Sequence, residues 1–291
     1  MFENLTYLLQ TEPGLLIVFS GLFGLFIGSF LNVVIYRLPV MMQRSWRQQC
    51  QELLEHPIEH HERFNLATPA SRCPKCGHSI RAIENIPIIS FLLQRGRCKH
   101  CDTKISARYP AVELLTGIIS GVVAWKLGFG WPLAFALLLS WALITLTFID
   151  FDQQLLPDDI TLPLLWLGLL LSLFNIFTDM QSSIIGAVAG YLSLWSVYQL
   201  FKFATGKEGM GYGDFKLLAL FGAWFGWQAL PMVILLSSMV GAVVGISLIL
   251  FRGRDRQLPI PFGPYLAAAG WIAMLWGDEI VSGYWRYMVQ P

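Results

Sequence analysis

Residues 14–34 read GLLIVFSGLFGLFIGSFLNVV, a run of twenty-one residues without a charged side chain. At 1.5 Å per residue, a helix of this length crosses about 30 Å of hydrocarbon. No Lys or Arg precedes the run, it is longer than the apolar core of a signal peptide, and no small-residue cleavage site follows it. We therefore expect a retained membrane span that ends at Arg37 and Pro39.

The composition of the whole chain favours the same environment. Of the 291 residues, 55% are hydrophobic and 13% are charged, against about a quarter charged in an ordinary soluble domain. Aromatic residues make up 14%, as expected where rings also lie at membrane–water boundaries. The net charge of +1 offers no case for a nucleic-acid partner.

Seven further apolar segments predict membrane helices, which gives an all-α polytopic membrane protein with about eight transmembrane helices. The segments lie near residues 109–128, 131–149, 160–177, 183–203, 215–228, 230–251 and 262–276. Two of them are short, so counts of seven to nine remain open. Small residues in GAVAGY, residues 186–191, predict close helix packing.

The basic residues are concentrated between the first two spans. Residues 40–108 hold eleven of the twenty Lys and Arg, all five His and all five Cys. If each predicted span crosses the membrane once, eighteen of the twenty basic residues fall on one side, including those of the 202–216 and 252–256 segments. Only Lys126 and Arg286 fall on the other side. The positive-inside rule makes that side cytoplasmic and places both termini outside.

Three domains follow from this threading. Residues 1–39 form the first transmembrane helix, residues 40–108 form a small cytoplasmic domain, and residues 109–291 form a membrane core of about seven helices.

Two acids fall at the cytoplasmic ends of predicted membrane helices. The third span ends in LTFID at Asp150, and the sixth begins after GMGYGD at Asp214. Acids at the edge of hydrocarbon are costly unless they face a polar interior, so they indicate function. Two carboxylates held close can divide the roles of general base and general acid, as in aspartyl proteases. The glycines before Asp214 would allow a sharp turn and the approach of a substrate backbone.

Each acid also has a simpler interpretation. Asp214 could be the N-cap of the sixth helix, a common use of Asp. Asp150 belongs to a loop that also carries Asp152, Asp158 and Asp159, which we expect in solvent or at the cap of the next helix. Spacing alone does not decide which of these acids is catalytic.

Four cysteines form two CxxC pairs. Cys73 and Cys76 are separated by twenty-one residues from Cys98 and Cys101, a spacing near that of structural zinc ribbons. A polar domain of this size has little core of its own, and a structural Zn2+ would supply the missing stability. Two disulfides are the alternative, which a reducing cytoplasm disfavours.

The remaining polar residues of the basic segment receive no catalytic role. His78 and His100 are expected at the surface or next to the metal ligands, and His56, His60 and His61 on a solvated face, whereas Cys50 is left over. Residues 84–98, ENIPIISFLLQRGRC, mix apolar residues with a basic turn, as an interfacial segment or a strand pair would. Glu113 is expected to reach the interface or to pair with Arg108.

Four motifs together resemble the bacterial type IV prepilin peptidase family. They are GSFLNVVIYRLP, the paired CPKC and CKHC, LTFIDFDQQLLPDDITLPLLWLGL and GMGYGDFKLLA, in the family's order over almost the whole chain. The family consists of GxGD intramembrane aspartyl proteases. Carried over by motif, the resemblance implies Asp150 and Asp214 as the catalytic pair, and favours Asp150 over Asp152.

The resemblance also implies a substrate and a second activity. Members remove short basic leaders from type IV prepilins and from pseudopilins of type II secretion, after a Gly at the cytoplasmic face of the inner membrane. Many then methylate the new N-terminal amine with S-adenosyl-L-methionine, and Gly96 matches a family position associated with methyl transfer. The sequence does not identify the methyl-donor pocket.

Two other classes of protein remain as alternatives. A cation-coupled transporter with a zinc-binding regulatory domain would hold its acids near the bilayer centre, whereas both acids here are predicted at one edge. A non-catalytic assembly factor could use the zinc domain to recruit a partner.

Overall fold

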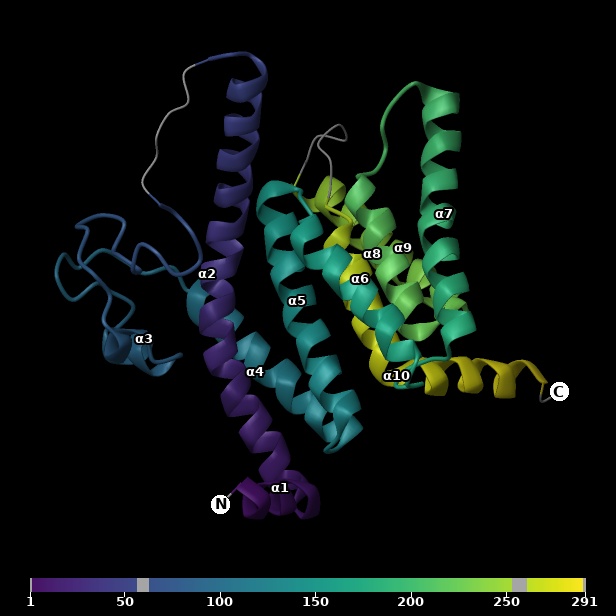
Figure 1. Ribbon diagram of the computed structural model, residues 1–291, viewed down its shortest axis with the longest axis horizontal. Helices are drawn as coiled ribbons and strands as arrows, with labels where there is room; N and C mark the ends of the chain where they lie inside the picture. The colour runs from purple at the N-terminus through teal and green to yellow at the C-terminus, as the bar shows by residue number, and fades with distance from the viewer. Residues whose placement is uncertain (1, 57–62, 253–260, 290–291) are drawn as a thin grey trace. The chain divides into compact units, whose positions relative to one another are not determined.

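The computed structural model describes residues 2–56, 63–252 and 261–289, and its regular structure over these residues is helical (Figure 1). Isolated β-bridges join Arg72 to Ser79 and Arg97 to Lys104, but no strand forms in this part of the chain. The expected all-α polytopic class is therefore confirmed. His60, His61 and most of the 252–256 segment lie outside the described residues.

The elements follow one another as α-helices, two of them preceded by 3-10 turns. In chain order they are α1 (Phe2–Thr11), α2 (Pro13–Leu53), η1 (Ala82–Asn85), α3 (Ile89–Leu93), α4 (Arg108–Leu127), α5 (Trp131–Gln153), α6 (Asp158–Ser172), α7 (Met180–Thr205), α8 (Tyr212–Phe225), η2 (Trp227–Ala229), α9 (Leu230–Arg252) and α10 (Gly263–Val289).

Five described helical stretches are long and apolar enough to cross a membrane. They are Pro13–Leu53, Arg108–Leu127, Trp131–Gln153, Met180–Thr205 and Trp227–Ser247. The other three predicted spans coincide with α6, α8 and α10, of which α6 and α8 have 15 and 14 residues and are shorter than an ordinary bilayer crossing. The count of eight spans remains a prediction.

The chain divides into two compact units, residues 1–129 and 130–291. In the first unit α2 does not end near Pro39, as the sequence suggested, but continues to Leu53. A proline removes one hydrogen bond from a helix interior, and the residues that follow are rich in Met, Gln and Arg, which favour helix. The helix therefore extends beyond its apolar run.

Within the first unit, α2 and α4 pack closely along their lengths. A Cβ at Gly28 would lie 2.7 Å from the Cα of Glu113, so only glycine allows this approach. Farther along, Asn32 Nδ2 donates to the Tyr109 carbonyl at 3.0 Å. These contacts fix the antiparallel register of the two helices.

Arg37 fastens the extramembrane segment to α2. Its side chain is buried and donates to the carbonyls of Asn65 at 2.9 Å and Pro69 at 2.7 Å. The guanidinium also lies over the Phe64 ring, 5.5 Å from its centroid. These hydrogen bonds to backbone carbonyls compensate the burial of the charged Arg37 guanidinium at the end of the apolar run.

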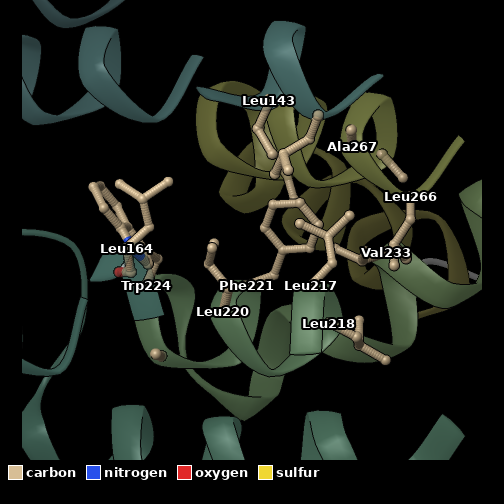
Figure 2. Close-up of a cluster of buried hydrophobic side chains, with 14 of the residues drawn as sticks. Leu143, Leu164, Leu217, Leu218, Leu220, Phe221, Trp224, Val233, Leu266 and Ala267 are labelled. Carbon is tan, nitrogen blue, oxygen red and sulfur yellow. Dashed lines mark hydrogen bonds between the residues drawn. The ribbon is translucent and has the colours of Figure 1, made fainter. Parts of the chain in front are cut away.

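The second unit is built around α8. Leu217, Leu220 and Phe221 are fully buried in a cluster that includes residues of α5, α6, α9 and α10 (Figure 2). Trp224 Nε1 donates to the Leu164 carbonyl of α6 at 2.8 Å. A helix that is apolar on all sides requires such a surrounding, and this surrounding places the polar start of α8 at one end of the bundle.

Glycines bring α7 and α8 into backbone contact. Any Cβ at Gly186 would overlap the Gly222 carbonyl, and one at Gly190 would lie 2.6 Å from the Leu218 carbonyl oxygen. The close packing predicted for residues 186–191 is therefore confirmed.

Candidate active site and metal centre

Asp150 lies in the last turn of α5, three residues before the helix ends at Gln153. Its side chain is buried with 6% exposure. Carboxylate atom Oδ2 has no hydrogen-bond partner among the described residues. A buried carboxylate oxygen in that state is costly, and such a cost is typical of a residue kept for function.

Asp214 lies in the first turn of α8 and is also buried, with 7% exposure. The N-cap of α8 is Gly211, and no side chain caps this helix end. The interpretation of Asp214 as an N-cap is therefore wrong. Its backbone N–H donates to the Gly211 carbonyl at 3.3 Å, so the glycine turn itself closes the helix start.

Close contacts through Leu156 connect the two acids. A Cβ at Gly213, next to Asp214, would lie 2.7 Å from Leu156 Cβ, and a Cβ at Gly263 would lie 3.1 Å from Leu156 Cδ2 and 2.7 Å from Asp150 Oδ2. The structure thus brings the end of α5 and the starts of α8 and α10 together around two buried carboxylates.

The neighbouring acids lie in different surroundings. Asp152 and Asp159 are exposed, and Asp158 forms an ion pair with Lys216, 2.7 Å between Oδ2 and Nζ. The expectation that these acids lie in solvent or at a helix start is confirmed, because Asp158 and Asp159 open α6. Among the four acids of residues 150–159, burial selects Asp150.

The four predicted cysteines meet in one cluster. Their Sγ atoms all lie within 4.8 Å of one another, with 3.7 Å between Cys73 and Cys101 and 4.0 Å between Cys76 and Cys98. A tetrahedral site with Zn–S bonds of about 2.3 Å needs sulfur separations of about 3.8 Å. All four are free thiols, so the disulfide alternative is wrong and the cluster fits a tetrahedral metal ion.

Two turns of the same design present the thiols. In the first, Cys73 N–H donates to the His78 carbonyl at 2.9 Å, and in the second, Cys98 N–H donates to the Thr103 carbonyl at 2.9 Å. Gly77 and Asp102 follow the second cysteine of each turn with φ of 71° and 53°. Gly and Asp tolerate this left-handed conformation better than most residues, so the local sequence suits the turn.

Hydrogen bonds around the cluster favour thiolates at two positions. The backbone N–H groups of Cys76 and Lys75 lower the pKa of Cys73. The hydroxyl and backbone of Thr103 lower the pKa of Cys101 to about 6. A metal binds the thiolate, which these two positions favour, whereas burial and the neighbouring sulfurs raise the pKa of Cys76 to about 11.

The other polar groups of this segment surround the cluster and do not enter it. The rings of His78 and His100 stack with centroids 3.8 Å apart, and His78 Nε2 lies 3.5 Å from Glu84 Oε2. The four-sulfur cluster contains neither histidine, as expected. Cys50 is exposed and outside it.

Gly96 has a structural reason to be glycine. Its φ is 66°, and its N–H donates to the Phe91 carbonyl at 2.9 Å to close the turn after α3. A Cβ would also lie 3.1 Å from the Phe91 ring. The described residues around it do not identify a methyl-donor pocket.

Sequence reasoning missed two features of these sites. Gly263 lies against Asp150, and the only signal was a glycine between prolines in PFGP, residues 261–264. The expectation that Glu113 reaches the membrane interface is wrong. Instead it is buried and accepts a hydrogen bond from the Ile88 N–H at 2.8 Å.

Comparison with known proteins decides the family. Residues 22–127 match the bacterial peptidase A24 N-terminal domain, and residues 137–246 match the type IV leader peptidase family. The chain belongs to the type IV leader peptidase family. This family membership supports the enzyme interpretation and gives no support to a transporter.

Relatives align with nearly the whole chain. A protein of Stutzerimonas stutzeri named prepilin leader peptidase/N-methyltransferase is 56% identical over 96% of this chain and 97% of its own length. Proteins of the same name from Pseudomonas aeruginosa and Legionella pneumophila are 53% and 45% identical, each over 96% of this chain and over 97% and 98% of their own lengths respectively. No solved structure matches the chain.

Proposed function

We propose that this type IV leader peptidase is an intramembrane aspartyl endopeptidase that removes the short basic leaders of type IV prepilins and type II secretion pseudopilins after a Gly. The observation that carries the proposal is the pair of buried carboxylates, Asp150 and Asp214, at one end of the second unit. The names of the full-length relatives support the substrate and a following N-methylation of the new N-terminus.

In the proposed reaction the two acids share one proton. The ionised carboxylate takes a proton from water, and the resulting hydroxide adds to the scissile carbonyl carbon. The protonated carboxyl donates its proton to the carbonyl oxygen. When the tetrahedral intermediate collapses, the C–N bond breaks and the leaving amine takes a proton from the first acid. The hydroxyl formed from the carbonyl oxygen returns its proton to the second acid, which restores the starting pair. Burial of both acids supports such a division, since two close buried carboxylates do not both ionise readily.

Gly213 and Gly263 allow close packing around the acids. Side chains at 213 and 263 would fill space now taken by Leu156 and Asp150 Oδ2. A larger residue at either position would therefore displace Leu156 or the Asp150 carboxylate.

The four-cysteine cluster is proposed to hold one structural Zn2+. Cys73, Cys76, Cys98 and Cys101 would complete its shell, which leaves no position for a reactive water. The metal would supply folding energy to a segment with little core of its own.

For methylation, S-adenosyl-L-methionine would be the methyl donor, and Gly96 is retained only as a candidate for that step. We place the enzyme in the bacterial inner membrane, with the acids and the metal domain, residues 40–108, on the cytoplasmic side. The segments 1–39 and 109–291 remain the proposed first transmembrane helix and membrane core. The distribution of Lys and Arg supports this orientation.

Mass measurement of a prepilin peptide incubated with the purified enzyme, with and without methyl donor, tests both activities. Asp150→Asn and Asp214→Asn are each expected to lower cleavage by about 10²–10⁴-fold or more, because each removes one proton-transfer group. The matched control is Asp152→Asn, whose side chain is exposed and whose activity should stay near that of the unsubstituted enzyme. Substantial cleavage by either of the first two variants would contradict the proposed pair.

A further inference from the structure

The segment from η1 to α3, Ala82–Leu93, exposes apolar side chains beside the membrane helices of the first unit. Leu93 is 80% exposed and Leu92 67% exposed. Ile83 and Ile89 are also exposed. Side chains of this kind gathered on a five-residue helix and its preceding turn are unusual for a surface that faces only water.

The depth of this segment follows from the register of α2 and α4. Gly28 of α2 lies against Glu113 of α4, and Gly28 is six residues inside the apolar run that ends at Val34. Six helical residues correspond to about 9 Å. Glu113 therefore lies alongside hydrocarbon and not at the membrane surface.

A hydrogen bond attaches α3 at that depth. The Ile88 N–H, just before α3, donates to Glu113 Oε2 at 2.8 Å. A helical side chain tilts toward the N-terminus of its own helix, which places Ile88 somewhat nearer the surface than the Glu113 backbone but still beside the apolar run. Leu92 and Leu93, the exposed leucines of α3, come four and five residues after Ile88 in the chain.

Most backbone donors from Ile88 to Gly96 have partners within the protein. Hydrocarbon offers no hydrogen bonds, so backbone groups in it need partners within the protein. Pro87 has no N–H, and Glu113 satisfies the one from Ile88. The following donors that pair with carbonyls inside the segment are the N–H groups of Ile89, Ser90, Leu92, Gln94, Arg95 and Gly96.

Basic side chains flank the apolar ones. Arg81 precedes the segment, Arg95 and Arg97 follow it, and all three are exposed. Arginines at such positions can extend toward anionic phosphate groups while their neighbours stay in hydrocarbon.

We propose that the part of this segment from Pro87 to Leu93 is a shallow re-entrant wedge, which inserts into the leaflet next to it and contacts lipid acyl chains, with Arg81, Arg95 and Arg97 on anionic lipid headgroups. Glu113 is the positioning residue that sets its depth. Glu84, in the preceding turn, stays against His78 and Lys99 of the metal domain. The proposal rests on the first unit alone and does not depend on the catalytic assignment.

Spin-label accessibility in vesicles of phosphatidylethanolamine and phosphatidylglycerol tests the wedge. A nitroxide is attached at Leu93→Cys in a Cys50→Ser chain, with a label-to-protein ratio near one as the check that the clustered thiols stay unlabelled. Collisions with oxygen, which concentrates in lipid, should exceed those with a water-soluble nickel complex. The control is Gln48→Cys, on an exposed position of α2 beyond the apolar run. There, collisions with the nickel complex should exceed those with oxygen.

Two results at position 93 would overturn the proposal. Frequent collisions with the nickel complex would place α3 in water. Few collisions with either reagent would show that protein covers it, from the rest of the chain or from a second copy, since no substrate is present in the vesicles.

The role of Glu113 is tested in the same labelled chain. Glu113→Leu removes the acceptor for the Ile88 N–H and should move the label toward water, whereas Glu113→Gln keeps an amide oxygen acceptor and should preserve its depth. Equal depth in both variants would contradict the anchoring role, even with the wedge inserted. Retained shielding of the four clustered thiols identifies variants whose metal domain is still folded.

Discussion

Asp150 and Asp152 stand two residues apart at the end of α5, yet only Asp150 is buried, with 6% exposure. Residues two apart on a helix point to different faces. Asp150 thereby faces the start of α10, where Gly263 lies against it. The difference between a candidate catalytic acid and a solvated one is set by the face of the helix and not by the local sequence.

Gly263 offers a test of that contact. Gly263→Ala would place a Cβ 2.7 Å from Asp150 Oδ2, a separation that forces the carboxylate or α10 to move. Displacement of a catalytic group by a fraction of an ångström to an ångström should lower kcat by about 10- to 100-fold. Steady-state cleavage of a prepilin peptide measures this loss.

The matched control for Gly263 lies on the same helix. A Cβ at Gly277 would meet only Met232 Cε at 3.5 Å, an ordinary contact, so Gly277→Ala should cleave normally. Full activity of Gly263→Ala would show that this glycine is not needed at the proposed site.

Among the elements, the metal domain depends on two short turns and not on a hydrophobic core. Beyond the end of α2, its described elements are a four-residue 3-10 turn and the five-residue α3, with isolated bridges in place of a sheet. The strand pair considered for residues 84–98 is therefore wrong. The four thiols replace the core that the segment lacks.

Replacement of Cys73 and Cys76 together by Ser should remove about one equivalent of bound zinc, since half of the ligand shell is lost. Metal analysis of the purified protein measures this. The domain should loosen because metal-binding energy is folding energy, while peptide cleavage should survive better than in Asp214→Asn.

Cys50→Ser is the control for the metal experiment because Cys50 is exposed and outside the cluster. It should retain its zinc. A folded double variant that loses cleavage as completely as Asp214→Asn would assign the metal domain to the active site, against the proposed division of roles.

The contact between α7 and α8 is a second test at the scale of elements. Gly186→Ala would drive a Cβ into the Gly222 backbone, and overpacking of this kind costs about 1–3 kcal/mol. Thermal unfolding in detergent should therefore begin at a lower temperature.

Gly283→Ala provides the comparison for Gly186→Ala. Nothing lies within 4 Å of a Cβ at this helical position, and alanine favours helix over glycine. Its unfolding temperature should be unchanged or higher. Equal unfolding of Gly186→Ala and the unsubstituted protein would contradict the backbone contact of α7 with α8.

At the scale of the whole molecule, the proposed chemistry requires both acids on one side of the membrane. In a Cys50→Ser chain, single cysteines at Asp159 and Lys207, both exposed, should react only with a reagent that reaches the cytoplasmic side. A cysteine at Gln181, at the other end of α7, should react only from the opposite side.

The topology experiment has one result that the protease proposal does not survive. If Asp159→Cys and Lys207→Cys were labelled from opposite sides, the thickness of the membrane would separate Asp150 from Asp214. No proton could then pass between water, peptide and both acids in one site.

The sequence by itself determined the membrane class, the position of the basic segment, the four candidate metal ligands and the two candidate acids. These properties depend on local quantities, namely hydropathy over about twenty residues, the spacing of CxxC pairs and acids at the ends of apolar runs. Because hydropathy is such a local quantity, each of the eight predicted spans overlaps a helix of the structure.

Only the tertiary structure decided which side chains meet. It buried Asp150 while leaving Asp152 exposed, brought Gly263 against the carboxylate, and paired Glu113 with the Ile88 N–H. Each of these contacts joins residues from different elements, and the packing of whole helices sets which faces touch. No pattern within a single segment carries that information.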